Sequence, residues 1–120
     1  MNRLALILTC LFGTTLLTSA ATADGRHKLV LIAGKPSHPP GMHEFRAGTR
    51  LLAKCLQESG IEVVLGEMGW VADESAFKDA DAVVIYSDGG GKHPAVQENH
   101  LDTLRALVAK GVGFGCMHYG

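Results

Sequence analysis

The chain has little of several features that would indicate a nucleic-acid or nucleotide partner. Its net charge is −1 at pH 7, from 11 basic and 12 acidic residues, and aromatic residues make up only 6% of it. It has no run of basic residues and no series of aromatic side chains, so binding to a phosphate backbone is not expected. The glycine run Gly89 to Gly91 fits neither G-x-G-x-x-G nor a P-loop, which disfavours nucleotide binding.

Cysteine is also scarce, with only Cys10, Cys55 and Cys116 in the chain. The first falls in an apolar segment at the N-terminus. Cys55 is predicted on the inner face of a helix and Cys116 in a buried strand. These two could form a disulfide in an exported protein, but their predicted elements favour two buried free thiols.

The N-terminal segment has the layout of a secretory signal peptide. A short basic start is followed by the apolar run Leu4 to Leu17 and by small residues that end at Ala23. The run is shorter than the roughly 20 apolar residues of a membrane span, although an uncleaved anchor is the alternative. We therefore predict cleavage after Ala23 (or after Ala21), and one mature domain, residues 24–120, that is secreted or periplasmic and not attached to a membrane.

The rest of the chain alternates between buried-strand and helix patterns. Apolar runs predict strands at 28–33, 61–65, 82–86 and 112–117, and helical spacing predicts helices at 43–59, 73–77 and 94–110. Strands that alternate with helices are typical of a doubly wound α/β fold with a parallel sheet and helices on both faces. Because the sequence stops at a strand exit, we expect it to be the N-terminal part of a longer protein.

Three of the predicted strands are followed by polar loops that carry histidine. In open parallel sheets the carboxyl ends of the strands share one edge, where ligands bind. Imidazoles with carboxylates nearby can act as acid and base, hydrogen-bond a polyol or hold a divalent metal, and the sequence leaves these uses open. The residues expected to line the site are His38, His43, Glu44, Asp88, His93 and His118.

Most of these residues also have a structural interpretation. His38 precedes two prolines and could be an exposed loop residue. Glu44 stands at a predicted helix start, where a negative charge favours the dipole. Asp88 could cap the glycine turn, and His93 could cap the helix that begins at Pro94.

His118 is the strongest candidate for an acid, a base or a metal ligand. It stands at the centre of Cys116-Met-His-Tyr-Gly120, in the place that a sharp turn after a strand lifts to the top of the sheet. Cys116 lies two residues earlier, inside the predicted strand, and is a poorer candidate nucleophile.

Three segments together resemble the ThuA-like (trehalose utilisation) domain in its exported bacterial form. They are residues 31–45, the loop 86–93 and the segment 113–119. The resemblance implies a class I glutamine amidotransferase-like, flavodoxin-like fold and a link to carbohydrate metabolism. His118 stands where amidotransferases of that fold have their nucleophilic cysteine, so amidotransferase activity is not implied.

The leading hypothesis is therefore an exported domain that binds or acts on a small carbohydrate, with catalysis of the hydrolase or lyase type left open. The alternative is a non-catalytic module that recognises carbohydrate or a partner within a larger secreted protein. A third hypothesis, a hydrolase that uses Cys116, predicts that turnover is lost in Cys116→Ser.

Overall fold

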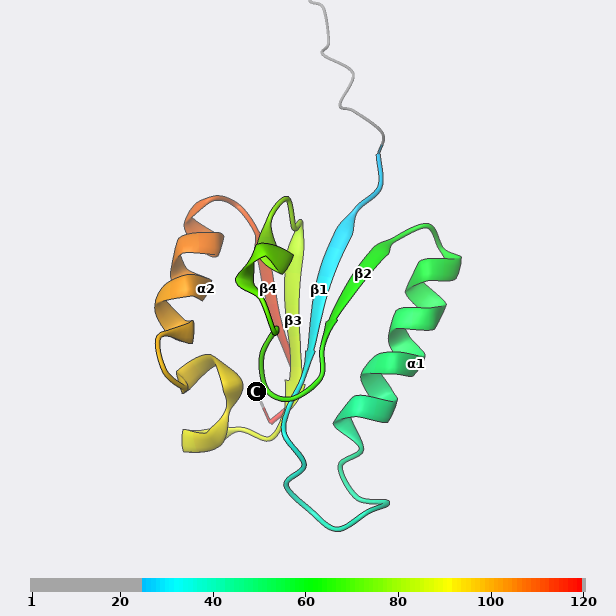
Figure 1. The fold of residues 1–120 in the computed structure, drawn as a ribbon, viewed down its shortest axis with the longest axis vertical. Coiled ribbons are helices and arrows are strands. Elements are labelled where there is room, and N and C mark those ends of the chain that lie inside the picture. The colour runs from blue at the N-terminus through cyan, green and yellow to red at the C-terminus, as the bar shows by residue number, and fades with distance from the viewer. Residues whose placement is uncertain (1–24, 120) are drawn as a thin grey trace, which may run out of the picture.

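The computed structural model describes residues 25–119 and shows a parallel sheet between helices (Figure 1). Two α-helices and three short 3₁₀ helices connect four strands. In chain order the elements are β1 (Lys28–Ala33), α1 (Phe45–Glu58), β2 (Glu62–Gly66), η1 (Glu74–Phe77), β3 (Ala82–Ser87), η2 (Gly90–Lys92), η3 (Pro94–Val96), α2 (His100–Ala109) and β4 (Gly113–His118).

The four strands lie in the order β2-β1-β3-β4, and every neighbouring pair is parallel. From β1 the chain turns through α1 to β2 on one side, and from β3 it turns through α2 to β4 on the other. The direction of winding thus reverses between β1 and β3. In open α/β sheets, ligands bind beside the carboxyl ends of the strands at this reversal.

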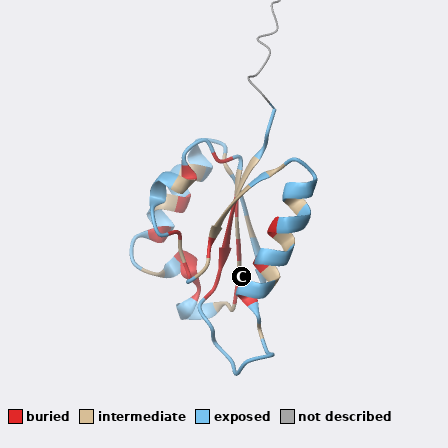
Figure 2. Ribbon diagram, turned by 45° about the vertical axis from the view of Figure 1, so that its right-hand side comes forward, coloured by how far each residue is buried: buried red, intermediate tan, exposed pale blue. Residues whose placement is uncertain are grey.

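One face of the sheet carries the main core, built from alternate residues of the central strands. Val30 and Ile32 of β1 pack with Val83 and Ile85 of β3, and all four are at most 1% exposed. Phe77 of η1, Ala95 of η3 and Leu104 of α2 complete this core. Figure 2 shows the buried residues along the central strands and on the inner sides of the helices. Burial of this kind is the main favourable contribution to folding.

Helix α1 covers the opposite face. It buries Phe45, Thr49 and Ala53, and the Phe45 ring meets Tyr86 of β3 edge to face at 5.0 Å. The prediction that Cys55 lies on the inner face of this helix is wrong, because Cys55 is exposed. Besides Phe45, the helix buries only small side chains, and Leu51 on the adjoining side faces solvent.

The helix predicted at 94–110 is interrupted. Pro94–Val96 forms the 3₁₀ helix η3, and the α-helix begins only at His100. Between them Glu98 has a φ of 48°, in the left-handed region that breaks a right-handed helix. The interruption buries the ring of His100, whose Nδ1 lies 2.8 Å from the carbonyl oxygen of Pro94.

Strand β4 forms one edge of the sheet and is mostly exposed. Phe114 is 45% exposed and Met117 39%, and Cys116 is a free, exposed cysteine. The prediction that Cys116 lies in a buried strand is therefore wrong. Both described cysteines, Cys55 and Cys116, are free, as expected.

The predicted signal peptide, residues 1–23, lies outside the described residues. Within residues 25–119, none of the helices has the length and apolar character needed to span a membrane.

Candidate functional site

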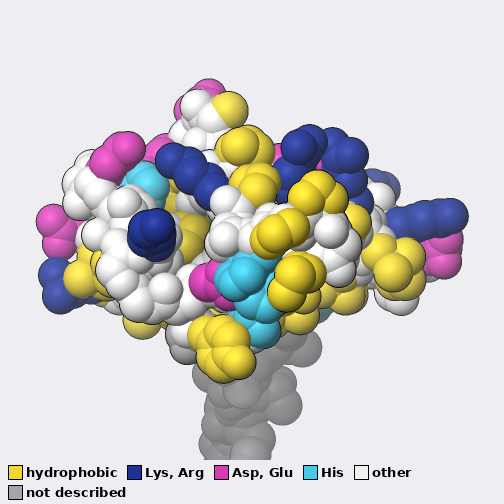
Figure 3. Space-filling model, turned by 90° about the horizontal axis from the view of Figure 1, so that it is seen from below, with side chains coloured by type: hydrophobic (Ala, Val, Ile, Leu, Met, Phe, Trp, Pro, Cys, Tyr) yellow, Lys and Arg dark blue, Asp and Glu magenta, His cyan; other side chains and the backbone are white. Residues whose placement is uncertain are grey.

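The candidate site lies at the carboxyl edge of the sheet, where winding reverses between β1 and β3. The loop after β1 supplies His38 and His43, the residue after β3 is Asp88, and the last residue of β4 is His118. Figure 3 looks onto this edge and shows histidine side chains grouped beside an acidic one. The parallel sheet thus brings together residues that are far apart in the sequence.

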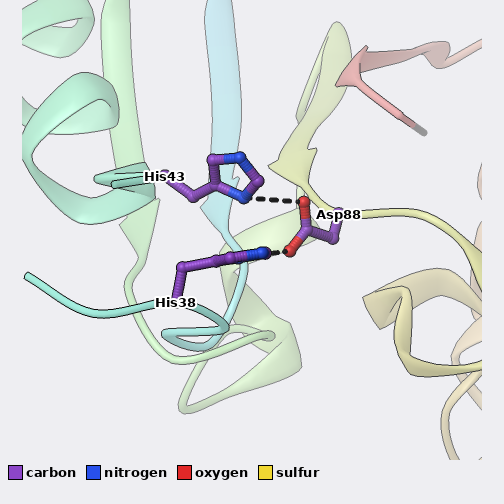
Figure 4. Close-up of side chains that lie close together, drawn as sticks. All are labelled: His38, His43 and Asp88. Carbon is purple, nitrogen blue, oxygen red and sulfur yellow. Dashed lines mark ion pairs between the residues drawn. The ribbon is translucent and has the colours of Figure 1, made fainter. Parts of the chain in front are cut away.

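Asp88 is the centre of the group, and three imidazoles surround its carboxylate. Its Oδ1 lies 3.1 Å from Nδ1 of His43 and 3.2 Å from Nε2 of His118, and its Oδ2 lies 3.6 Å from Nδ1 of His38. Figure 4 shows His38 and His43 pointing from one loop toward opposite oxygens of this carboxylate. We call these four residues the histidine–aspartate cluster.

The cluster is half-buried. The side chains of His43 and His118 are each 27% exposed, that of Asp88 is 26% exposed and that of His38 is 40% exposed, so solvent and a ligand can both reach the cluster. Nδ1 of His43 is itself buried and has no hydrogen-bond partner, because its contact with Asp88 is close but poorly aligned. A buried nitrogen facing a carboxylate oxygen without a hydrogen bond is a place where a proton or a cation would be stabilised.

The pKa of the Asp88 carboxyl lies below its ordinary value, chiefly because the Ser37 hydroxyl acts on it as a hydrogen-bond donor. The His43 and His38 rings lower this pKa further, and partial desolvation opposes them. The Ser37 hydroxyl also lies 2.9 Å from Nδ1 of His38. Asp88 is therefore an anion at neutral pH and can orient or neutralise protonated imidazoles.

Ring packing fixes the orientation of the imidazoles. The centroids of His38 and His43 are 3.9 Å apart, and those of His43 and His118 are 4.7 Å apart. Phe45 supports His43 at 5.8 Å from inside the fold, and Tyr119 lies against His118 at 4.2 Å. Rings held on several sides keep their side-chain rotamers, which a binding or catalytic site requires.

Two histidines of the cluster have unusual backbone conformations. His43 has a φ of 50° and His118 a φ of 72°, both in the left-handed region. A residue with a Cβ atom held there costs about 1–3 kcal/mol, and such residues concentrate at functional sites. For His118 the positive φ agrees with the sharp turn after a strand that the sequence indicated.

Two glycines let the loops of the cluster approach one another. A Cβ atom on Gly34 would lie 2.4 Å from Cβ of Ser87, and one on Gly89 would lie 2.0 Å from the carbonyl oxygen of Tyr119. Gly34 thus joins the exits of β1 and β3, and Gly89 joins the exits of β3 and β4. The glycine run after β3 therefore has a packing role here.

Glu44 and His93 lie outside the cluster. Glu44 accepts a hydrogen bond from the Gly41 amide at 2.6 Å and lines a small hollow with His38 and His43. His93 is 7% exposed, and its Nδ1 accepts a hydrogen bond from the Ala95 amide at the start of η3. Its Nε2 is buried without a partner, and desolvation lowers its pKa. The contacts of His93 thus agree with its structural interpretation as a helix cap.

Cys116 does not have the surroundings of an activated nucleophile. Desolvation raises the pKa of its thiol. Reactive cysteines have the opposite shift, because a nearby positive charge or a helix N-terminus stabilises their thiolate. This observation disfavours the hypothesis of a hydrolase that uses Cys116.

A larger hollow of about 710 Å³ adjoins the cluster, and Asp88 is in its wall. The hollow lies between the exits of β1, β2 and β3 and the segment that leads into α2. Sequence reasoning missed the part formed by Trp70, Gln97 and Glu98, which follow β2 or precede α2. The only signal was their place at the same edge of the sheet, since none of the three has the spacing of a known motif.

Comparison of the chain with protein-family models, with curated proteins and with solved structures found no match in any of the three, so the resemblance to ThuA-like domains stays an expectation.

Proposed function

We propose that this chain is an exported ThuA-like domain that binds and transforms a sugar or sugar derivative at the carboxyl edge of its sheet. The observation that supports this most is the histidine–aspartate cluster, in which three imidazoles face one carboxylate within 3.6 Å at the reversal of winding. Hydroxyl groups of a sugar need donors and acceptors close together, and imidazoles supply both. Glutamine amidotransferase activity is not part of the proposal, since the resemblance places His118 where that chemistry needs a cysteine.

In this proposal His118 moves the proton. Imidazole can serve both as a general base and as a general acid, so the His118 ring can accept a proton from a sugar hydroxyl and return it to a leaving group. Asp88 stabilises the imidazolium that forms, because its Oδ1 lies 3.2 Å from Nε2 of His118. His38 and His43 are placed to hold neighbouring hydroxyl groups of the same ring. Tyr119 keeps the His118 ring in position by packing against it.

The same residues fit a divalent metal such as zinc. Ligand atoms of His38, His43 and Asp88 all lie within 4.8 Å of one another, and Nδ1 of His43 has no other partner. Two imidazoles and a carboxylate are a common ligand set of catalytic zinc sites, which keep a further position open. A metal bound there would polarise a sugar oxygen or lower the pKa of a water molecule. His118 would then serve as a fourth ligand or as the base beside it.

The test is made on the purified mature protein and three single variants. His118→Ala and His38→Ala remove members of the cluster. The matched control is His27→Ala, because His27 also faces an aspartate, with Nδ1 3.5 Å from Oδ2 of Asp81, but at the amino edge of the sheet. Metal content is measured by elemental analysis, and sugar binding and turnover are measured with a panel of mono- and disaccharides.

The proposal predicts that both cluster variants lose turnover by about 10²-fold or more, the usual contribution of a positioned acid or base, while His27→Ala keeps it. Stoichiometric metal that disappears in the cluster variants would support the metal form. A binder without chemistry would show a loss of affinity and no turnover in any variant. If wild type and cluster variants bound sugars equally and turned over none, the proposal would be wrong.

A further inference from the structure

Charged side chains of both signs line the hollow beside the histidine–aspartate cluster. Four charged side chains line it: Lys35, Asp88, Lys92 and Glu98. Asp88 faces three imidazoles, and the Glu98 carboxylate lies 3.7 Å from Nε2 of His100. Both acidic groups therefore have cationic or potentially cationic neighbours. Within residues 25–119, Lys35 and Lys92 have neither an ion pair nor a side-chain hydrogen bond.

The two lysines approach the hollow from different elements. Lys35 follows β1, and its aliphatic stem lies over Gly69, where a Cβ atom would be only 3.3 Å from Cγ of Lys35. The Gly69 amide in turn donates a hydrogen bond to the carbonyl oxygen of Ala33 at 2.8 Å. The aliphatic part of the Lys35 side chain thus packs along its length against Gly69, in the segment that follows β2. Lys92 ends η2, on the side of β3.

Trp70 and His100 form an aromatic part of the lining. The Trp70 and His100 rings are stacked at 3.8 Å with an angle of 2° between their planes. Nε1 of Trp70 donates a hydrogen bond to Glu74 at 3.0 Å, which fixes the indole. An indole offers apolar surface to a ligand, while amines bind acidic groups. The lining of the hollow therefore combines an aromatic part with two amines.

We propose that this hollow binds the acidic group of the substrate, so that the protein takes a sugar carrying a carboxylate or a phosphate in preference to a neutral one. The inference rests on the proposed function, because Asp88 belongs to both the hollow and the cluster and one ligand would span them. Lys35 and Lys92 would pair with the acidic group. The hydroxyl groups at the other end of the ligand would reach His38, His43 and His118.

The experiment compares three matched probes, glucose, glucuronate and glucose 6-phosphate, with inorganic phosphate as a competitor. Calorimetry on the full mature protein gives the dissociation constants of wild type, Lys35→Met/Lys92→Met and the control Lys110→Met. Lys110 is exposed at the C-terminal end of α2 and does not line the hollow. Methionine keeps the aliphatic stem and removes only the charge.

We expect the acidic sugars to bind wild type on the order of tenfold more tightly than glucose, the sum of two exposed ion pairs. The double variant should lose this preference, and Lys110→Met should keep it. Raising the salt from about 20 mM to about 300 mM should also reduce the preference in wild type. Whether glucuronate or glucose 6-phosphate binds more tightly distinguishes a carboxylate ligand from a phosphate ligand.

Equal binding of neutral and acidic sugars would overturn the inference and leave the proposed function standing. A preference that survives in the double variant, or no binding of any acidic probe, would also overturn it. Conversely, lysine-dependent binding of an acidic sugar that His118→Ala and His38→Ala leave unchanged in affinity and rate would support the inference while contradicting the proposed function.

Discussion

Gly89 and Tyr119 are in backbone contact, because a Cβ atom on Gly89 would lie 2.0 Å from the carbonyl oxygen of Tyr119. The φ of Gly89 is −83°, which any residue adopts, so glycine is required there for space alone. The contact holds the exit of β4 against the exit of β3. It therefore sets how near His118 comes to Asp88.

The first prediction follows from this contact. Gly89→Ala should push Tyr119 and His118 away from Asp88 and cost about 1–3 kcal/mol of stability, the usual penalty for overpacking. Gly91→Ala is the matched control, since a Cβ atom on Gly91 would have nothing within 4 Å and the φ of Gly91 is ordinary. Urea unfolding measures the stability, and the chemical shifts of the His118 ring report the displacement. Equal stability of the two variants would show that the contact is absent in solution.

The second prediction concerns acid stability and Asp88. Because its folded pKa is lowered, its contribution is fully present above the unfolded pKa of about 3.9 and is lost as the pH falls through the lower folded value. The difference in unfolding free energy between wild type and Asp88→Asn should thus shrink as the pH falls from about 5 to about 2.5. If the difference in unfolding free energy between wild type and Asp88→Asn stayed constant over this pH range, the lowered pKa of Asp88 would be contradicted.

The third prediction concerns His93 at a higher pH. Desolvation lowers its folded pKa, and its Nδ1 accepts a hydrogen bond, so burial favours the neutral ring. Its contribution is present above the unfolded pKa of about 6.5 and is lost as the pH falls through the folded value. His93→Asn keeps an acceptor for the Ala95 amide but does not titrate. From about pH 8 to about pH 5, wild type should lose more stability than this variant, as measured by urea titrations. If wild type and His93→Asn lost the same unfolding free energy over this pH range, protonation of His93 would not be the cause of the loss.

The fourth prediction compares one substitution at two positions. Leu31→Ala in β1 should cost about 2–5 kcal/mol, because the side chain is fully buried. Leu51→Ala in α1 should change stability by less than about 0.5 kcal/mol, because Leu51 is 66% exposed. Denaturant unfolding of both variants checks which face of α1 packs on the sheet. A comparable loss of stability in Leu51→Ala would show that Leu51 packs against the sheet, contrary to its exposure in the structure.

The sequence predicted the strands well, because buried parallel strands are short runs of branched apolar residues. The bounds of β1 match the prediction, and β2, β3 and β4 differ from it by one residue at one or both ends. The meeting of His38, His43, Asp88 and His118 could also be expected, since parallel strands place their carboxyl ends at one edge.

Other features depend on how the elements pack in three dimensions, and residue types alone do not predict them. Leu51 and Cys55 fit the apolar stripe of α1, yet the helix turns Thr49 and Ala53 to the sheet because small side chains allow close approach. The helix predicted from Pro94 is broken at Glu98, whose conformation has no local sequence signal. The contact between Gly89 and Tyr119 depends on the relative position of two strands.

The left-handed backbone of His43 and His118 sets a limit on engineering this protein. Glycine would relieve the conformational cost at both positions, and it would also remove two imidazoles from Asp88. A library selected for thermal stability alone should therefore accumulate glycine at these positions and lose ligand binding in the same step. Selection for stability and selection for ligand binding would thus favour opposite residues at these two positions.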